Sequence, residues 1–581
     1  MSLPLLPLAA AAGDDSPAGN TPDAWRAARR IIDLHQHIDF TTQHLARAIA
    51  INNAAGVGLG VNLSGGYTTR PADGGPSEFE RNRTLADTLH PGRFLHYMNL
   101  DFGHWDQPDF AQQAVRQVEE GHRLGAAGLK FFKEFGLVVR DASGALVKID
   151  DPRLDAMWHR CGELAMPISI HVADPKAFWE PYEEHNERWK ELKDHKSWWF
   201  GDPAKHPPRM ELLAALDRVI ARHPETTFVC VHFGNNSEDL AWVDDALTRR
   251  PNMMVDLAAR IPEIGRHNPA ATRRMFIKHQ DRILFATDFQ IYNKAILGSS
   301  GNEAPPSDVD AEVFFLKEWR WLETNDRHWE HMTPIQGDWT ISSIGLPEGV
   351  LRKIYFDNAR KLLARSLPTP TLRARRTTRD FVPDGDLGKE IWRTAAPVII
   401  DRLLASGAAK PELSTTVRAL WSAEFLYLSY ECPYHQIVTF PVGSATGKRF
   451  DLAKEGASLW DRDVVEAFIA PDAAAPARYG EFETAPTNER LDLLVDLPRK
   501  DFAWASGFQT ATRVDRRSHV WTCEMRIPLR ALSPTAPSAG TEWRINLYRQ
   551  EASRHAFLAW HPTLTATAHT PARFGRLEFT E

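Results

Sequence analysis

The sequence predicts a (β/α)8 barrel followed by an all-β sandwich. The chain has 581 residues, which is more than a single hydrophobic core usually organises, so we expect at least two domains. From residue 23 onward, short β-rich runs alternate with amphipathic helical segments, a pattern typical of parallel strands joined by helical crossovers. Beyond residue 382 the helical segments stop and runs of alternating apolar and polar residues follow one another, as in a sandwich of antiparallel strands.

Eight β-rich runs form the predicted barrel. In chain order they are RIIDLHQH, GVGLGVNL, RFLHYMNLDF, GLKFFKEF, PISIHVAD, TFVCVHFG, NMMVDLAA and RILFATD. The segments between them place apolar residues three and four positions apart, which predicts helices with one apolar face. Eight such units close a barrel near residue 290, and the helical segments VFFLKEWRWLE and LPEGVLRKIYFDNARKLL are expected to pack around it.

Polar residues stand where several of these strands end. His35 and His37 lie two apart on the first strand and therefore face the same side. His171 ends the fifth strand, His232 the sixth and Asp288 the eighth. The carboxyl ends of barrel strands meet at one rim, where active sites form. We therefore expect these five residues to meet at that rim and to form a site for a divalent metal ion, with four of them as its ligands.

The constellation resembles the amidohydrolase superfamily, in particular its amidohydrolase 2 branch of lactonases, other hydrolases and metal-dependent decarboxylases. The similarity covers residues 30–365 and rests on the HxH of strand 1, the histidines of strands 5 and 6, and the aspartate of strand 8. It implies an enzyme with one ion rather than two, held by His35, His37, His171 and Asp288. Zinc is the expected ion and manganese is the alternative, because the ligand types alone do not separate them.

The same resemblance implies roles in catalysis. A bound ion acidifies water and polarises the carbonyl group of the substrate. Asp288 is expected to take the proton of the attacking water and to pass it to the leaving group. His232 is expected to polarise the carbonyl or to stabilise the oxyanion.

Strand 4, in GLKFFKEFG, carries two lysines. Lys130 and Lys133 are three positions apart, so only one of them faces the inside of the barrel. Some members of the superfamily carry a carbamylated lysine here that bridges two metals. The alternative, which a one-metal site favours, is that the inward lysine is an unmodified cation that binds a substrate carboxylate or pairs with Asp288. We predict that Lys130 takes part in catalysis and that Lys133 and Glu134 contact the substrate.

Two further features near the rim suggest substrate contacts. Asp256 and Arg260 follow strand 7, where Arg260 is suited to hold a carboxylate with two hydrogen bonds, although a structural ion pair between the two is the alternative. A long segment after strand 5, PKAFWEPYEEHNERWKELKDHKSWWFGDP, is either a wall of the pocket, with Trp179 against the substrate, or a contact between copies in a homo-oligomer.

The remaining segments bound the two domains. We assign residues 23–365 to the barrel, residues 366–381 to a basic Pro- and Thr-containing linker, and residues 382–581 to the sandwich. The linker lacks interleaved aromatic residues and the net charge is −7, so nucleic acid is not an expected partner. Residues 1–22 contain an apolar run that ends in small residues, as in an export signal; the alternative is a disordered tail of a cytoplasmic protein. No later run is apolar over a length that spans a bilayer.

The second domain resembles carbohydrate-binding modules of family 9. The similarity rests on DGDL followed by Trp392, ALWSAEFLYLSYE, LWDRDVVEAFIAP, YGEFETAPTNERLD, EMRIPLRAL, WRINLYRQE, LAWHPT and the closing RFGRLEF. It implies a sugar ligand stacked on aromatic rings, with these candidates for contact: Trp460, Glu483, Trp504, Arg549 and Trp560. Trp392 and Trp543 lie in segments with a strand-like pattern and are expected in the core.

These observations favour an exported, metal-dependent hydrolase that opens a lactone, ester or amide of a small sugar-acid-like substrate. The alternative is a non-oxidative decarboxylase of an aromatic or unsaturated acid, because the resemblance supports both reactions with the same ligands.

Overall fold

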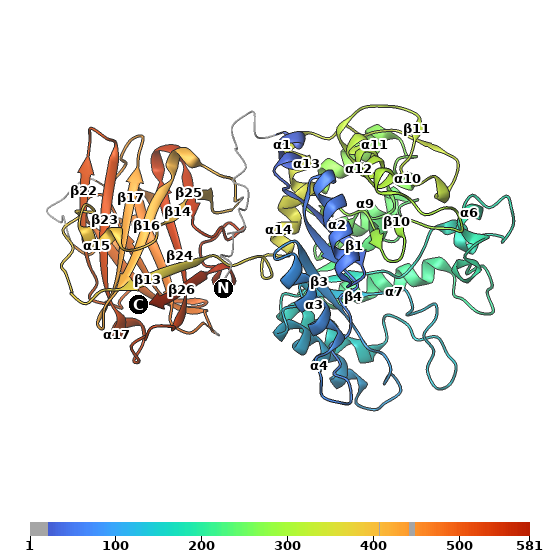
Figure 1. Cartoon of the computed structure of the whole chain (residues 1–581), viewed down its shortest axis with the longest axis horizontal. Coiled ribbons are helices and arrows are strands. Elements are labelled where there is room, and N and C mark those ends of the chain that lie inside the picture. Colours follow the sequence, from blue (N-terminus) through green and yellow to red (C-terminus); the bar gives the residue numbers. More distant parts are fainter. Residues whose placement is uncertain (1–20, 406, 441–447, 474) are drawn as a thin grey trace. The chain divides into compact units, whose positions relative to one another are not determined.

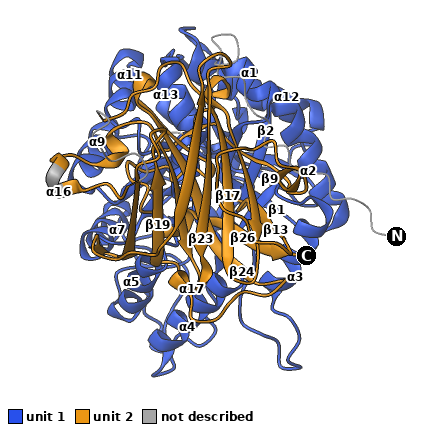
Figure 2. Ribbon diagram, turned by 90° about the vertical axis from the view of Figure 1, so that its left-hand side faces the viewer, with its two compact units in different colours: residues 1–366 blue, residues 367–581 orange. Residues whose placement is uncertain are grey.

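The computed structural model describes residues 21–405, 407–440, 448–473 and 475–581. The predicted export signal falls almost entirely on residues 1–20, which lie outside the described residues. The chain divides into two compact units, Met1–Ser366 and Leu367–Glu581, coloured separately in Figure 2. Within the described ranges, no helix combines the length and the hydropathy needed to cross a membrane.

The first unit is the predicted barrel. Eight parallel strands are hydrogen-bonded in chain order: β1 (Ile31–Ile38), β2 (Val57–Asn62), β3 (Phe94–Asn99), β4 (Gly128–Phe131), β5 (Ile168–Ile170), β6 (Phe228–Cys230), β7 (Met253–Asp256) and β8 (Ile283–Leu284). The chain after β8 returns to β1: the Leu34 N–H donates to the Phe285 carbonyl (3.1 Å) and the Asp288 N–H to the His35 carbonyl (2.9 Å). These bonds close the barrel and place Asp288 beside the strand that carries the HxH pair.

Helices cover the barrel strands, as Figure 1 shows. They are α2 (Thr42–Ala55), α3 (Glu78–Leu89), α4 (Phe110–Arg123), α5 (Asp155–Glu163), α7 (Arg209–Arg222), α9 (Leu240–Arg249), α11 (Pro269–Lys278) and α12 (Asp308–Glu323), with the shorter α1 (Pro22–Ala27), α8 (Val231–Gly234) and α10 (Ile261–Ile264). Local signals fix their starts. At α3, the Ser77 hydroxyl accepts from the Glu80 N–H and the Glu80 carboxylate accepts from the Ser77 N–H, which satisfies two otherwise unpaired donors.

The closing helix is interrupted. The predicted single helix is α13 (Glu348–Arg352), a π-helical turn over Lys353–Asp357, and α14 (Asn358–Leu362). Buried Asn358 donates from Nδ2 to the carbonyls of Gln280 and Ile283, both at 2.8 Å, and so fastens the helix to the start of β8. The sequence also gave no sign of four short strands beyond β8: β9 (Phe289–Ile291), β10 (Ala295–Leu297), β11 (Trp329–Glu330) and β12 (Thr340–Ile341).

The long segment after β5 is packed rather than open. It contains α6 (Trp189–Leu192) and two 3-10 turns, Lys176–Trp179 and Lys196–Trp198. Its Arg188 is 1% exposed and forms ion pairs with Glu191 (3.0 Å) and with Glu263 of α10 (3.1 Å). A buried arginine held by two carboxylates fixes the segment against the rest of the barrel unit.

The second unit is a β-sandwich, as predicted. Its strands are β13 (Thr371–Arg376), β14 (Val398–Ile400), β15 (Arg402–Leu403), β16 (Thr415–Trp421), β17 (Phe425–Pro433), β18 (Val464–Ala470), β19 (Arg478–Thr484), β20 (Arg490–Asp496), β21 (Arg499–Asp501), β22 (Gln509–Asp515), β23 (Val520–Pro528), β24 (Glu542–Glu551), β25 (Ala556–Ala559) and β26 (Gly575–Thr580). Short helices α15 (Glu390–Arg393), α16 (Leu452–Glu455) and α17 (Leu529–Leu532) connect some of them. One apolar cluster contains side chains from β17, β18, β23 and β24, so two layers of strands share a core. Trp392 (2% exposed) and Trp543 (3% exposed) are buried in the sandwich unit, as expected.

The predicted linker is wrong over part of its length. Residues Thr371–Arg376 form β13, which pairs in parallel with β26 and β16 inside the sandwich. Leu372 and Ala374 are fully buried, whereas the arginines between and after them point outward. The alternation of apolar and polar residues that is typical of a strand is present in TLRARR. The many arginines made the segment look like a linker, although charged side chains are tolerated on the solvent side of a strand.

Three buried glutamates lie on one face of the sandwich sheet. Glu466 of β18 is directly opposite Glu483 of β19, and Glu481 lies two positions along β19 on the same face. All three are at most 3% exposed, and both carboxylate oxygens of Glu483 lack a hydrogen-bond partner. Two basic groups lie near these glutamates. One is the His569 ring, whose Nδ1 lies 3.9 Å from the Glu481 carboxylate, and the other is the Lys500 ammonium. Burial and mutual repulsion raise the pKa of Glu483 well above its usual range, and burial raises the pKa of Glu481 to about 7.

This cluster predicts that the sandwich is more stable in weak acid than in weak base. Carboxyl groups whose pKa is raised by folding stabilise the folded state when protonated, and this contribution is lost as the pH rises through about 7. Glu483→Gln keeps the shape of the protonated acid, so we expect it to raise the free energy of unfolding at pH 8 by about 1–3 kcal/mol. Thermal unfolding of the full chain between pH 5 and pH 8 measures this. The half-exposed Glu542, replaced in the same way, is the control, and an unchanged pH dependence in Glu483→Gln contradicts the prediction.

Candidate metal centre

The four predicted metal ligands and His232 lie close together at the carboxyl end of the barrel strands. His35 and His37 approach each other through their Nε2 atoms (3.2 Å), and each Nε2 lies 3.6 Å from Asp288 Oδ1. One ligand atom each from His35, His232 and Asp288 also lies within 4.8 Å of the others. The His171 ring is 4.4 Å from the His232 ring, centroid to centroid. Both sets of three share His35 and Asp288, which therefore stand at the middle of the site.

Unusual backbone conformations place two of these side chains. His232 has φ 55° and Asp288 has φ 61°, in the left-handed region that residues other than glycine seldom adopt. Such conformations cost free energy and persist where the surrounding structure holds them. Here the His232 N–H donates to the carboxylate of Asp256 (2.7 Å), and the Asp288 N–H donates to the His35 carbonyl (2.9 Å).

Each imidazole contacts a second group through one of its two nitrogens. Nδ1 of His35 lies 2.9 Å from Asp256 Oδ2, Nδ1 of His37 lies 2.6 Å from Ser64 Oγ, and Nδ1 of His232 lies 2.8 Å from the Ala258 carbonyl. For His171 the contact is reversed, because Nε2 lies 3.2 Å from the Ala173 carbonyl. Such contacts leave the other nitrogen of each ring available to a metal, as in structured metal sites.

Burial sets the protonation states at the rim. It lowers the pKa values of His35, His37 and His232 well below the usual 6.5 and that of His171 to about 4. The rings are therefore neutral at neutral pH, which is the form that binds metal ions. Burial raises the pKa of Asp288 to about 7, while the cations Lys130 and Arg260 lower it.

Lys130, not Lys133, is the lysine that faces the site. Lys130 is 2% exposed and its Nζ lies 3.4 Å from His35 Nε2; burial lowers its pKa to about 8. Lys133 instead forms an ion pair with Asp174 (2.5 Å), whose other oxygen lies 3.3 Å from His171 Nε2. The prediction that Lys133 binds substrate is therefore corrected to a contact that supports Asp174 and, through it, His171.

Asp256 also differs from its predicted role. It is fully buried and bonds to the His35 ring and the His232 backbone, so it supports two residues of the candidate metal site and is not free to bind substrate. No ion pair joins Asp256 to Arg260 among the described residues. Arg260 is 7% exposed and donates to the carbonyl of Ala259; no carboxylate of the described part of the chain pairs with it. Glu134 keeps one buried carboxylate oxygen without a hydrogen-bond partner.

The sequence interpretation missed several supporting residues. Asp33 accepts hydrogen bonds from the His35 N–H (3.2 Å) and from both the N–H (3.1 Å) and the hydroxyl (2.6 Å) of Thr287, which links β1 to the segment that carries Asp288. Its position two residues before His35, on the same face of the strand, was the available signal. Ser64 and Asp174 gave a weaker signal, because each merely follows a strand end.

Trp179 and the sugar-contact candidates of the second unit are placed as follows. The Trp179 indole N–H donates to the Pro207 carbonyl (2.9 Å) and its ring packs on Phe200, within the segment after β5. Trp504 and Trp560 pack partly buried against the cluster between the sandwich layers, and Trp460 packs against a second cluster.

Two of the sugar-contact candidates are corrected. Glu483 is fully buried and Arg549 is 1% exposed. Arg549 shares its sheet face with Val465, whereas Glu483 lies opposite Glu466 on the other face, so the two cannot contact one sugar. The Arg549 guanidinium donates to the Leu413 carbonyl (3.1 Å) and the Thr415 hydroxyl (2.8 Å), which is a structural role.

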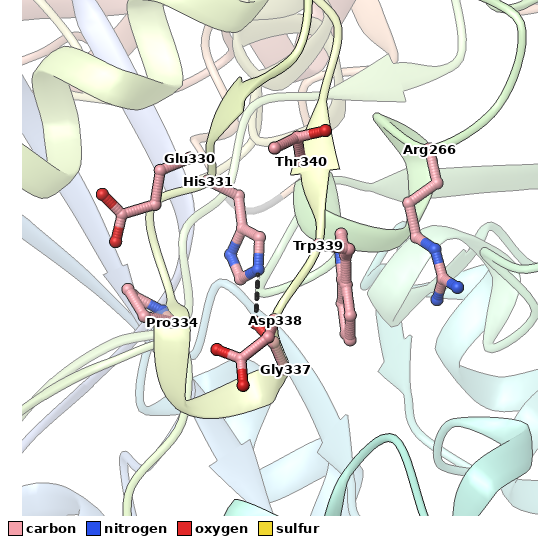
Figure 3. A pocket seen from close by; sticks show the side chains of 8 residues that line it. All are labelled: Arg266, Glu330, His331, Pro334, Gly337, Asp338, Trp339 and Thr340. Carbon is pink, nitrogen blue, oxygen red and sulfur yellow. Dashed lines mark hydrogen bonds between the residues drawn. The ribbon is translucent and has the colours of Figure 1, made fainter.

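A surface hollow of about 700 Å³ lies in the barrel unit away from these ligands. Figure 3 shows the residues that line it, which are Arg266, Glu330, His331, Pro334, Gly337, Asp338, Trp339 and Thr340. The Trp339 ring is covered by Arg266, 4.5 Å from its centroid, and lies 5.1 Å from the His331 ring. These neighbours occupy the aromatic surface that a stacked ligand would need.

Several known proteins are similar to parts of this chain. The curated protein named "Extracellular protein" from Arthroderma benhamiae is 27% identical over 188 residues, which is 29% of this chain and 80% of that protein. A family 9 carbohydrate-binding module from Caldicellulosiruptor kristjanssonii, solved with cellotriose, is 17% identical and covers 36% of this chain and 94% of its own, with a TM-score of 0.27. The 2,6-dihydroxybenzoate decarboxylase from Rhizobium is 14% identical and covers 58% of this chain and 99% of its own, with a TM-score of 0.32.

Two family models match the chain itself. The model described as carbohydrate family 9 binding domain-like matches residues 383–581. The amidohydrolase model matches residues 32–365, which is more than half of the chain and includes every candidate ligand at the rim. The chain therefore belongs to the amidohydrolase family, and its barrel is followed by a carbohydrate family 9 binding domain-like unit.

Proposed function

We propose that this protein is a metal-dependent hydrolase that opens a lactone, ester or amide of a sugar-acid-like substrate. The observation that carries the proposal is the convergence of four neutral imidazoles and one carboxylate at the barrel rim. Nitrogen and oxygen donors of this kind suit zinc, with manganese as the alternative, and the shared position of His35 and Asp288 favours one ion. His35, His37, His171 and Asp288 would hold the ion, which supplies Lewis-acid polarisation of a carbonyl and acidification of water.

The side chains at the rim provide the proton transfers. Asp288 Oδ1 is placed to accept the proton of the attacking water and to deliver it to the leaving oxygen or nitrogen. His232 lies beside the ligands with its Nδ1 engaged by the Ala258 carbonyl, so its Nε2 is the atom that faces substrate or ion. The Lys130 ammonium adds positive charge where an oxyanion develops.

The environment of Arg260 favours a substrate that carries a carboxylate. It is a buried cation that bonds to one backbone carbonyl and pairs with no carboxylate among the described residues. A buried charge without a partner is costly, and a substrate carboxylate would supply the missing partner with two hydrogen bonds. This is the support for a sugar acid rather than a neutral sugar.

A proton-release assay tests the proposal. Full-length protein loaded with zinc or with manganese is mixed with aldonolactones, uronolactones and matched esters in the presence of a pH indicator. Matched amides are followed by the release of free amine, because amide hydrolysis releases no net proton at neutral pH. Release of acid or of amine from one class establishes hydrolysis and names the substrate class. If no compound is hydrolysed while hydroxybenzoates release carbon dioxide, the reaction is decarboxylation and the hydrolase proposal fails.

Arg260→Gln gives a prediction within the same assay. We expect KM for a lactone that carries a free carboxylate to rise about 10- to 100-fold, because one charge-assisted contact is lost. A neutral lactone of the same ring size should be affected less than about threefold. Arg266→Gln, at an arginine outside the rim, is the matched control. Equal changes in KM for charged and neutral lactones would show that Arg260 does not recognise a carboxylate.

We further propose that the protein is exported and that its second unit binds a carbohydrate. The family 9 match over residues 383–581 and the relative named "Extracellular protein" support both statements. Retention of the full chain on insoluble polysaccharide, measured with and without soluble oligosaccharide, tests the binding. Trp460, Trp504 and Trp560 remain the candidates for contact, because all three are partly exposed.

A further inference from the structure

We propose that Asp256 is a positioning residue that fixes His35 in the tautomer whose Nε2 is available to a metal ion. The inference rests on the proposed metal site but not on the identity of the substrate. Asp256 ends β7 and is fully buried, and the family resemblance assigns it no role. Apart from Asp288 itself, it is the carboxylate that contacts two residues of the rim in the described part of the chain, the ring of His35 and the backbone of His232.

The donor and acceptor pattern sets the tautomer. An ionised carboxylate only accepts hydrogen bonds, so the proton of the neutral His35 ring must lie on Nδ1, 2.9 Å from Asp256 Oδ2. The lone pair is then on Nε2. The Lys130 ammonium, which can only donate, lies 3.4 Å from that same Nε2 and requires the same assignment. Two independent neighbours therefore direct the His35 lone pair toward His37 and Asp288.

The other oxygen of Asp256 acts on a different strand. Oδ1 accepts the N–H of His232 at 2.7 Å, where the backbone adopts its left-handed conformation. One carboxylate thus holds a ring of β1 and the backbone just beyond β6. By holding the His35 ring, this side chain reduces the freedom that metal binding would otherwise remove, which strengthens binding, and the same side chain positions His232 beside the ligands.

Ser64 offers a matched comparison within the same site. Its hydroxyl lies 2.6 Å from Nδ1 of His37. A hydroxyl can donate or accept, so it tolerates either tautomer of His37 and does not select one. Asp256 and Ser64 therefore make similar contacts to neighbouring rings, but only Asp256 selects a tautomer.

Replacing Asp256 by asparagine distinguishes the positioning role of the carboxylate from a role in packing alone. The asparagine amide has one oxygen and one NH2 group in nearly the same volume as the carboxylate. If the oxygen stays with the His232 N–H, the NH2 group faces His35 Nδ1 and forces the ring proton to Nε2. If the amide flips, the NH2 group meets the His232 N–H and two donors oppose each other. Either arrangement disturbs one ligand without creating a cavity.

The test is zinc affinity of the full chain, measured by competition with a chromogenic chelator. We expect Asp256→Asn to weaken zinc binding about 10- to 100-fold, the usual cost of losing such a partner. Ser64→Ala should weaken it less than about threefold, because its partner does not depend on one tautomer. The visible spectrum of the cobalt-loaded Asp256→Asn variant should differ from that of the wild type, which packing alone would not cause. Wild-type zinc affinity and an unchanged cobalt spectrum in Asp256→Asn would overturn the proposal.

A second variant covers the case in which Asp256→Asn does not fold. Asp256→Glu keeps the accepting carboxylate, so we expect it to retain more zinc affinity than Asp256→Asn or, if that variant is unfolded, to bind zinc within about tenfold of the wild type. Loss of all zinc binding in a folded Asp256→Glu protein would overturn the proposal. Zinc binding by the wild type without hydrolysis of any lactone, ester or amide would reject the proposed function while leaving the role of Asp256 intact.

Discussion

Replacing Asp288 by asparagine is expected to lower kcat/KM for the hydrolysed substrate about 10²- to 10⁴-fold without unfolding the barrel. The loss follows from chemistry, because the amide cannot accept the proton that the carboxylate takes and is a weaker ligand for a cation. The fold should persist, because Asn is one of the few residues that tolerate the left-handed backbone found at this position (φ 61°). The Asp288 N–H to His35 carbonyl bond belongs to the backbone and remains.

The measurement is initial rate in the proton-release assay, with the unfolding temperature recorded for each variant. Asp281→Asn is the matched control, because Asp281 lies seven residues earlier on the same segment and pairs with Lys353 at the surface. We expect the control to keep wild-type activity. An Asp288→Asn protein with more than a tenth of wild-type activity would remove Asp288 from the proton-transfer role.

Glu524→Gln is expected to destabilise the sandwich unit by about 3–5 kcal/mol, the cost of breaking a buried charged contact. The Glu524 carboxylate is fully buried on β23. It accepts from the N–H groups of Asp384 (2.8 Å) and Gly385 (2.9 Å), from the Lys389 ammonium (2.7 Å) and from the Trp392 indole (2.7 Å). The amide that replaces it brings its own donors to a place where every neighbour donates, and it removes one of the two carboxylates that pair with the Lys389 ammonium, the other being Asp384 (2.6 Å).

Thermal unfolding of the full chain measures this loss. A change of that size corresponds to a fall of about 10 °C in the unfolding temperature for a unit of this length. Glu431→Gln, at an exposed glutamate on the neighbouring strand β17, should shift the temperature by less than about 2 °C. Similar small shifts in both variants would show that Glu524 does not anchor the segment around DGDLGKEIW.

Local patterns were sufficient to predict the order of the barrel strands and the meeting of the rim ligands. Strand and helix periods of two and about 3.6 residues are visible in the chain itself, and eight alternating units leave one closed arrangement. Because parallel strands end at one rim, His35, His171 and Asp288 had to approach one another, although more than 250 positions separate the first from the last. The resemblance to amidohydrolases rests on these same residues.

The partners of those ligands depended on tertiary structure. Asp256 supports His35 and His232, and Lys133 pairs with Asp174, because of where neighbouring strands place their ends in space. The sequence showed only that these residues carry charge near a strand end, which is equally compatible with substrate binding. A charged side chain takes the nearest partner that can neutralise it once it is removed from water.

The second unit shows the same limit. Alternating runs identified most of its strands, but β13 was hidden by arginines on its outer face, and Glu483 was taken for a surface residue. Strand alternation specifies that neighbours face opposite sides, and it does not specify which side other elements cover. Residue types and spacing thus determined the two folds and the chemistry available at the rim. Only the packing of distant segments decided which polar groups meet at the candidate metal site, which groups support them, and which are buried, because burial and neutralisation depend on contacts that no single segment contains.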